Sequence, residues 1–174
     1  MKPNIPYISI VIASYNRNAI TQESIISALN QDYPNNFFEV LVVDNNSFDG
    51  TVEEIKNNFS DYIKSEKLKV IPLKYNSGSS GSYVECLRHM TKGWNYMLKM
   101  DEDVILDSSC LKNMVKVASE DPSISMVGGK VFYKRYPEVI QAIGSKLRPY
   151  YAIAKGIGTN DSTRGAFNEQ LDLD

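Results

Sequence analysis

Three consecutive carboxylates, Asp101, Glu102 and Asp103, follow the partly apolar segment at residues 96–100. Neighbouring negative charges repel one another and cost stability unless a cation or solvent relieves them. Because side chains alternate along a strand, we expect Asp101 and Asp103 to lie on the same side of a strand end. Two such hard oxygen ligands suit Mg²⁺ or Mn²⁺ shared with a diphosphate. The alternative is a solvated acidic loop in front of the next helix.

A second polar cluster, residues 44–51, follows the apolar segment at residues 39–43. Its Asn, Asp, Ser and Gly residues are the types that an ordinary strand-to-helix turn needs. Asp44 is also placed where a carboxylate could accept hydrogen bonds from a base or a ribose. Both interpretations are open from the residues alone.

Two further clusters have residue types that suit a nucleotide. In residues 13–17, Ala13 is small enough for close approach, Tyr15 offers a flat face for a base, and Arg17 offers a cation to phosphate. Tyr15 would serve equally well in packing. Residues 76–82, which include Gly78, could present backbone N–H groups to a phosphate at a helix N-terminus, although a flexible loop explains the same composition.

These clusters are expected at the ends of strands. Apolar and β-branched runs alternate with segments of helical periodicity, which predicts right-handed crossovers and an α/β, Rossmann-like fold with a mainly parallel central sheet. In such sheets ligands bind beyond the carboxyl ends of the strands, so we expect the clusters to share one crevice. The expected strands are residues 7–13, 39–43, 68–73, 96–100 and 124–133, and the expected helices are 18–31, one beginning near 51, 82–93 and one around 111–118.

The pattern changes toward the end of the chain. We expect the fifth strand to bend at Gly128-Gly129, and residues 137–174 to be irregular. The length of 174 residues fits a single domain over residues 1–174.

Composition excludes several classes of protein. The net charge is −2 and no basic block occurs, which argues against a nucleic-acid partner. Two cysteines without a CxxC motif and a single histidine, His89, argue against a disulfide framework and a zinc site. The sequence has no signal peptide and no run of apolar residues long enough to span a membrane, so we expect a cytoplasmic protein. Attachment to the inner face of the membrane through regions outside this chain is compatible with that expectation.

The order and spacing of the four clusters resemble those of family 2 glycosyltransferases over residues 7–132. Asp-Glu-Asp together with residues 128–130 is most similar to the branch of rhamnosyl- and galactofuranosyl-transferases. The resemblance implies the GT-A fold, a UDP- or dTDP-sugar donor, and Mn²⁺ or Mg²⁺ bound through a DxD motif. It also implies a saccharide or lipid-linked acceptor in cell-surface polysaccharide synthesis.

The resemblance assigns roles to individual residues by position. The nucleotide-sugar site comprises Ala13, Tyr15, Arg17, Asp44, Asn46, Gly78 and Asp101. Asp103, with Asp101, would hold the metal that bridges the diphosphate. Residues 137–174 would begin the acceptor-side region and stop short of its end.

The implied reaction is inverting transfer, in which an acceptor hydroxyl attacks the anomeric carbon and the nucleoside diphosphate leaves. A general base is needed for the hydroxyl, and we expect it beyond residue 174 because no segment of this chain matches the family's base region. The chain is therefore expected to bind the donor and to transfer poorly.

Three other classes of protein compete with this interpretation. A non-catalytic nucleotide-sugar-binding or regulatory module would share the fold. A flavodoxin-like phosphate-receiving regulator needs an acidic pair where this chain has Ser14-Tyr15-Asn16. A sugar nucleotidyltransferase needs a glycine-rich basic loop after the first strand, and this sequence lacks one.

Overall fold

A computed structural model of the chain describes residues 5–148 and 153–157. Contacts divide the chain into two compact units, Met1–Val115 and Lys116–Asp174. A single domain over residues 1–174 therefore stays a prediction.

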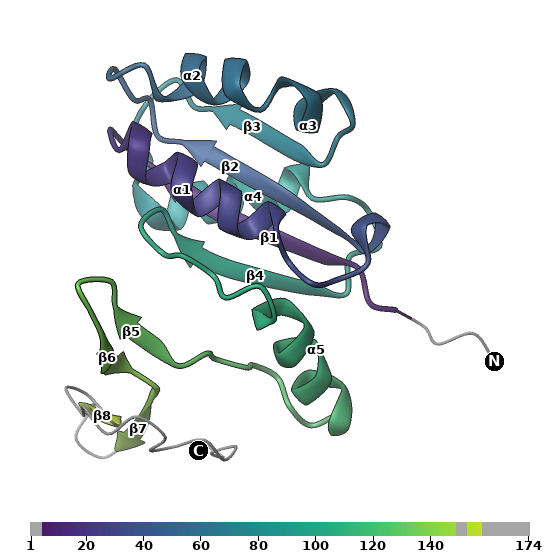
Figure 1. Cartoon of the computed structure of the whole chain (residues 1–174), viewed down its shortest axis with the longest axis vertical. Helices are drawn as coiled ribbons and strands as arrows, with labels where there is room; N and C mark the ends of the chain where they lie inside the picture. The colour runs from purple at the N-terminus through teal and green to yellow at the C-terminus, as the bar shows by residue number, and fades with distance from the viewer. Residues whose placement is uncertain (1–4, 149–152, 158–174) are drawn as a thin grey trace. The chain divides into compact units, whose positions relative to one another are not determined.

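The first unit contains a four-stranded parallel sheet, as the sequence predicts (Figure 1). Its strands are β1 (Ile8–Ser14), β2 (Phe38–Asp44), β3 (Leu68–Pro72) and β4 (Tyr96–Asp101), in the order β3-β2-β1-β4. The arrowheads of β2, β3 and β4 point toward the left in Figure 1. Every strand is parallel to its neighbours, so the carboxyl ends of all four meet at one edge.

The helices connect successive strands. They are α1 (Asn18–Leu29), α2 (Thr51–Asn58), α3 (Ser60–Lys64), α4 (Gly78–His89) and α5 (Cys110–Glu120), with a 3₁₀ turn, η1, at Asn35–Phe37. The short α3 is not expected from the sequence. It follows Phe59, whose backbone leaves helical geometry while its buried ring packs in the core.

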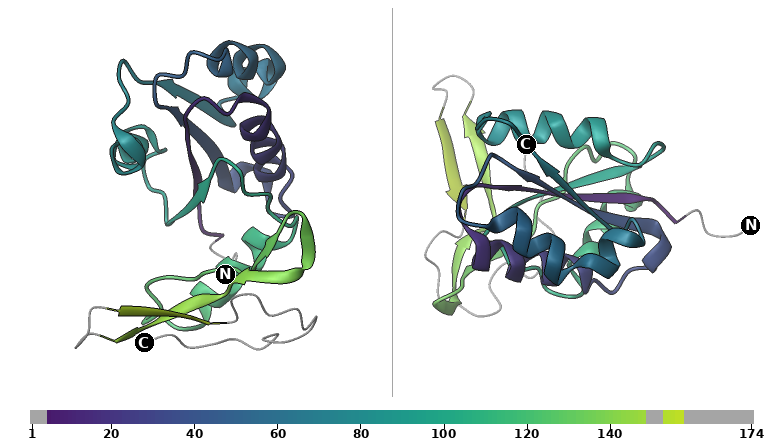
Figure 2. Two further views of the ribbon diagram at one scale, coloured as in Figure 1. Left: turned by 90° about the vertical axis from the view of Figure 1, so that its left-hand side faces the viewer. Right: turned by 90° about the horizontal axis from the view of Figure 1, so that it is seen from above.

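Helices cover both faces of the sheet, which explains why β1 and β2 are buried along their whole length. On one face, Ile10, Ile12 and Val40 pack against Ile25 of α1 and Ile55 of α2. Figure 2 shows α4 alone on the opposite side of the sheet from α1 and α2.

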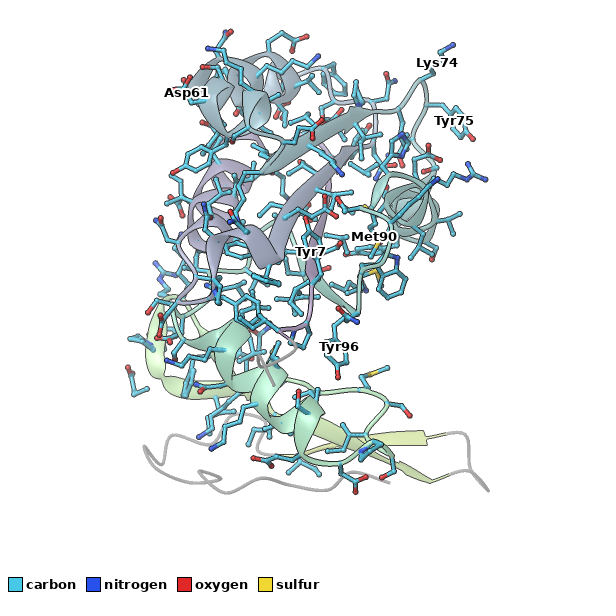
Figure 3. All side chains as sticks on the ribbon, turned by 90° about the vertical axis from the view of Figure 1, so that its right-hand side faces the viewer. Tyr7, Asp61, Lys74, Tyr75, Met90 and Tyr96 are labelled. Atoms are coloured by element: carbon cyan, nitrogen blue, oxygen red, sulfur yellow. The ribbon has the colours of Figure 1, made fainter. Side chains whose placement is uncertain are left out.

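The core under α4 is smaller. There Val11, Leu41 and Val43 pack with Cys86 and Met90. Figure 3 labels Met90 at the end of α4. Because each face has its own apolar cluster, the strands need apolar residues at successive positions, and this produces the continuous runs seen in the sequence.

A buried ionic cluster around Glu39 stabilises the amino-terminal end of the sheet. The carboxylate of Glu39 in β2 accepts hydrogen bonds from Ser9 Oγ at 2.8 Å and from Thr91 N at 2.7 Å, and pairs with Lys69 Nζ at 2.7 Å. Burial by itself raises the pKa of Glu39, but the bonds with Lys69, Thr91 and Ser9 outweigh it and hold the pKa below its usual value. The cluster joins β1, β2, β3 and the segment after α4.

The second unit corrects two expectations. Residues 124–130 form no regular structure, and only Val131–Tyr133 (β5) is a strand, paired antiparallel with β6 (Tyr136–Ala142). The two glycines at 128–129 offer no side chain to pack, which weakens a strand at that point. The predicted long fifth strand is therefore wrong in extent.

Regular structure also continues where an irregular segment is expected. Within residues 137–174, β6 is followed by a second antiparallel pair, β7 (Gly144–Arg148) and β8 (Ile153–Ile157). These strands are defined by their backbone hydrogen bonds to each other, and the pattern of side chains in the sequence does not indicate this pairing. Residues 149–152 and 158–174 lie outside the described part of the chain.

Candidate functional site

The predicted clusters meet at the carboxyl edge of the sheet. Ser14 at the end of β1 is in register with Asp44 at the end of β2, and Ala13 is in register with Asp101 at the end of β4. The loop after β1 also reaches the turn after β4, because Arg17 Nη1 lies 3.0 Å from Asp103 Oδ2. The expected common edge is thus observed.

The loops after β1 and β2 are fixed to each other by side chain–backbone hydrogen bonds. Asn16 N donates to Ser47 Oγ at 2.8 Å, and Phe48 N donates to Asn16 Oδ1 at 2.9 Å. Further along the same two segments, Asn18 N donates to Asp49 Oδ2 at 3.2 Å. These hydrogen bonds hold the two loops together although they lie about thirty residues apart in the sequence. Each such bond contributes about 1 kcal/mol to stability.

Asp44 shapes the second loop. Its side chain is 1% exposed, and its two carboxylate oxygens accept hydrogen bonds from the backbone N and the Oγ of Ser47. The neighbouring Asn46 is exposed and adopts a positive φ of 64°. Direct contact of Asp44 or Asn46 with a nucleotide stays a prediction, and the position of Asp44 gives it a role in holding the loop.

Asn45 is a site residue that the sequence analysis misses. Its N donates to Ser14 O at 2.8 Å, and its Oδ1 accepts from both the N and the Oγ of Ser77 at 3.1 Å. The backbone N–H of Asn45 thus contacts the end of β1, while its buried side chain ties the end of β2 to the residue before α4. An asparagine after a strand suggests a turn, and nothing in the sequence indicates that this one points inward.

The segment at residues 76–82 belongs mostly to helix α4. The sequence predicts a helix from Ser82, whereas α4 begins at Gly78, which has a φ of 70° and donates its N–H to Asn76 Oδ1 at 2.8 Å. The small residues that suggest a loop permit a tight first turn, because a Cβ on Gly81 would lie 2.5 Å from the Cβ of Ser77. A helix N-terminus, with its partial positive charge, thus stands after β3 at the same edge.

The acidic triplet turns away from strand geometry at its first residue. β4 ends at Asp101, and Val104 N donates to Asp101 O at 3.2 Å, so Asp103 lies in a turn. The expectation of strand geometry from Asp101 to Asp103 is therefore wrong, because the strand ends at Asp101. The turn is held from α1, where Ser24 Oγ donates to Glu102 O at 2.7 Å.

Asp101 has a partner from α4. The hydroxyl of Tyr83 lies 3.3 Å from Asp101 Oδ1 and 3.3 Å from Met100 O. Burial, followed by the charge of Asp101, raises the pKa of Tyr83 far above its usual value, so the hydroxyl keeps its proton and can donate.

Arg17 connects the first loop to the acidic turn. Besides its contact with Asp103, its Nε lies 3.6 Å from Glu102 Oε1. The side chains of Arg17 and Asp103 are 49% and 53% exposed, so the pair is open to solvent and to a ligand. Tyr15 is also exposed, whereas Ala13 is buried at the end of β1. The structure thus brings a cation, an aromatic face and two exposed carboxylates to one edge.

The residue types at this edge fit a divalent metal that is shared with a diphosphate. No group of three or more His, Cys, Asp or Glu side chains that could hold a metal occurs among the described residues. Mg²⁺ commonly takes only one or two carboxylates from the protein and completes its shell with phosphate oxygens and water. The exposed carboxylates of Asp101 and Asp103 match that donor set.

His89, in contrast, lies at the opposite end of α4 from this edge. It ends the helix, and its Nδ1 lies 3.0 Å from the carbonyl oxygen of Glu85. Its side chain is exposed, and it lies apart from the residues of the candidate site.

A model of the family described as Glycosyl transferase family 2 matches residues 9–165 of the chain. The chain belongs to this family. The match covers the whole sheet apart from the first residue of β1, and it includes every residue of the candidate site.

The curated relatives include a polysaccharide synthase and a putative glycosyltransferase. The chain is 24% identical over 161 residues to the poly-beta-1,6-N-acetyl-D-glucosamine synthase of Staphylococcus epidermidis, covering 92% of the chain and 37% of the synthase. It is 30% identical over 123 residues to the putative glycosyltransferase EpsE of Bacillus subtilis, covering 71% of the chain and 42% of EpsE. The chain therefore spans well under half of the length of these relatives.

Solved structures share the fold. A mannosyltransferase of Pyrobaculum calidifontis, in complex with GDP-Man and Mn²⁺, superposes with a TM-score of 0.63 and 24% identity over 76% of this chain and 37% of that chain. Residues 1–349 of Staphylococcus aureus TarS, in complex with UDP-GlcNAc, give a TM-score of 0.58 and 25% identity over 75% of this chain and 38% of that chain. The expected GT-A fold is confirmed. The more specific likeness to rhamnosyl- and galactofuranosyl-transferases stays a prediction.

Among the described residues, no helix has the length and apolar character needed to cross a bilayer.

Proposed function

We propose that this chain forms the donor-binding part of an inverting, metal-dependent glycosyltransferase that uses a UDP- or dTDP-sugar. The single observation that carries the proposal is the convergence of Arg17, Asp101 and Asp103 on one edge of a parallel sheet, where ligands of such sheets bind. Family membership and the UDP-GlcNAc complex of TarS support the same class of donor.

In this proposal the nucleoside lies over the loops after β1 and β2. Tyr15 stacks on the base, close to the buried Ala13, and Asn46 lies beside the ribose. Asp44 and Asn45 keep these loops in place through their bonds to Ser47 and Ser77. Ordered loops favour binding because less conformational entropy is lost when the ligand arrives.

The diphosphate lies between the first turn of α4 and the acidic turn. Gly78 begins that helix, so its neighbouring N–H groups and the positive end of the helix dipole attract phosphate. Arg17 supplies a guanidinium that can bind two phosphate oxygens at once. Asp101 and Asp103 would hold Mn²⁺ or Mg²⁺, which acts as a Lewis acid on the leaving diphosphate.

The acceptor side is inferred from the family. We propose a saccharide or lipid-linked acceptor in cell-surface polysaccharide synthesis. One curated relative is named as a poly-beta-1,6-N-acetyl-D-glucosamine synthase and another as a poly(ribitol-phosphate) beta-N-acetylglucosaminyltransferase, which supports a polymeric acceptor. The general base that takes the proton of the acceptor hydroxyl belongs, in this proposal, to a region after residue 174. Transfer by this chain alone should accordingly be slow.

Calorimetric titration tests the donor site. UDP, dTDP and GDP are titrated into the chain with and without Mn²⁺, and we expect UDP or dTDP to bind weakly without metal and at least tenfold more tightly with it. Asp103→Ala should remove the dependence on metal because it deletes a hard oxygen ligand. Lys112→Gln, on the exposed surface of α5, is the control that should leave both affinities unchanged. Tight binding of UDP that ignores Mn²⁺ would contradict the proposed role of Asp103.

A further inference from the structure

Arg17 and Asp103, two residues of the proposed donor site, form an ion pair with each other. Arg17 Nη1 lies 3.0 Å from Asp103 Oδ2, which is hydrogen-bond distance. In the proposed function both groups have other partners, the diphosphate for Arg17 and the metal for Asp103. A carboxylate oxygen that a guanidinium occupies is less available to a metal ion, because both partners compete for the same lone pairs and charge.

We propose that the ion pair with Arg17 keeps Asp103 from binding metal until a nucleoside diphosphate binds and draws Arg17 away. We call this ion pair the guard of Asp103. The inference rests on the proposed donor site and adds its regulation. The phosphates draw the guanidinium away from Asp103, and the freed carboxylate then becomes available to Mn²⁺ or Mg²⁺. Metal and nucleotide should therefore strengthen each other's binding beyond the effect of shared phosphate ligands.

Glu102 makes this exchange feasible. Its carboxylate lies 3.6 Å from Arg17 Nε, whereas Asp103 contacts a different nitrogen, Nη1. The Glu102 side chain is only 22% exposed, and its backbone oxygen is bonded to Ser24 of α1, so it is the more firmly placed of the two carboxylates. Arg17 can thus leave Asp103 and still be held within the site.

The exposure of the pair sets the size of the effect. Both Arg17 and Asp103 are about half exposed, so water screens their attraction. Exposed pairs of this kind correspond to a roughly two- to fivefold change in an equilibrium constant. A guard of this strength can be displaced by a diphosphate, which offers several oxygens in place of one.

The test measures binding of Mn²⁺ alone by calorimetry or by the electron paramagnetic resonance of the free ion, at low ionic strength. The variants are Arg17→Gln, Lys112→Gln and Asp103→Asn. Lys112→Gln is the matched control because Lys112 also pairs with a carboxylate at 3.0 Å, that of Asp32, and both pairs are exposed. Each of the two glutamine variants removes one positive charge from the chain.

We expect Arg17→Gln to bind Mn²⁺ alone about two- to fivefold more tightly than the wild type, with the gain shrinking at high salt. Lys112→Gln should match the wild type. In titrations with UDP, Mn²⁺ should raise the affinity by a smaller factor in Arg17→Gln than in the wild type, because the coupling of two ligands is reciprocal.

The outcomes separate this inference from the donor site itself. If Asp103→Asn weakens Mn²⁺ binding but Arg17→Gln changes it no more than Lys112→Gln does, the guard is refuted and the metal site stands. If Asp103→Asn binds Mn²⁺ as the wild type does, both proposals are wrong.

Discussion

Gly81, in the first turn of α4, should not tolerate even the smallest side chain. A Cβ at this position would lie 2.5 Å from both the Cβ and the Oγ of Ser77. Carbon atoms in contact normally lie about 3.5–4.0 Å apart, so an overlap of about 1 Å must be relieved. The Cβ of Ser77 is fixed to the backbone and cannot rotate away. The first turn of α4 must therefore move.

Two opposing contributions set the expected magnitude. Replacing glycine by alanine inside a helix stabilises it by about 0.5–1 kcal/mol. Overpacking typically costs about 1–3 kcal/mol. We expect Gly81→Ala to lower the free energy of unfolding by about 1–2 kcal/mol, since the overlap outweighs the gain in helix propensity. The shifted turn should also weaken UDP binding.

The assay is urea denaturation followed by circular dichroism, applied as a double-mutant cycle with Ser77→Gly. Without the Cβ of Ser77 the clash disappears, so Gly81→Ala should then stabilise the chain by about 0.5–1 kcal/mol. Ser80→Ala, an exposed substitution in the same turn, is the control and should be neutral or slightly stabilising. Gly81→Ala that equals or exceeds the wild type in stability would refute the packing argument.

Two further predictions concern buried polar groups. Glu39→Gln should destabilise the chain by about 1–3 kcal/mol in urea denaturation, moderated by the 30% exposure of its partner Lys69. Because folding lowers the pKa of Glu39, its contribution is present above the unfolded value of about 4.3 and is lost as pH falls through the folded value. Stability curves of the wild type and Glu39→Gln should therefore converge in acid, and parallel curves would contradict this assignment. Asn45→Ala should cost about 1–3 kcal/mol by leaving the Ser77 N–H without its acceptor, and should weaken UDP binding in calorimetry. Unchanged stability and unchanged affinity would show that Asn45 does not tie the loops together.

The sheet was predictable because its strands are locally distinctive. β1 and β2 are buried throughout, and their sequences are correspondingly apolar at nearly every position. Where a strand is not covered on both faces this signal disappears. Most positions described in β5 and β6 are exposed or half-buried, and there the sequence analysis misjudged the extent of regular structure.

The candidate site was predictable in its position and only partly in its contacts. Asp44 and Asp101 lie at strand ends as expected, and parallel pairing brings those ends to one edge. The start of α4 was placed four residues late because its glycine and serines also suit a loop. The sequence did not single out Asn45, because an asparagine after a strand is typical of a turn. Its inward orientation depends on the contact with Ser77.

The sequence alone indicates the four strands of the parallel sheet, the residues that follow them and the family that the pattern resembles, because these features depend on neighbours along the chain. Only the tertiary structure decided that Arg17 pairs with Asp103, 86 positions away, and that Ser47 occupies both oxygens of Asp44. Such contacts depend on strand order and on the path of each loop above the sheet. Those properties arise from packing of the whole unit, so no local stretch of sequence encodes them.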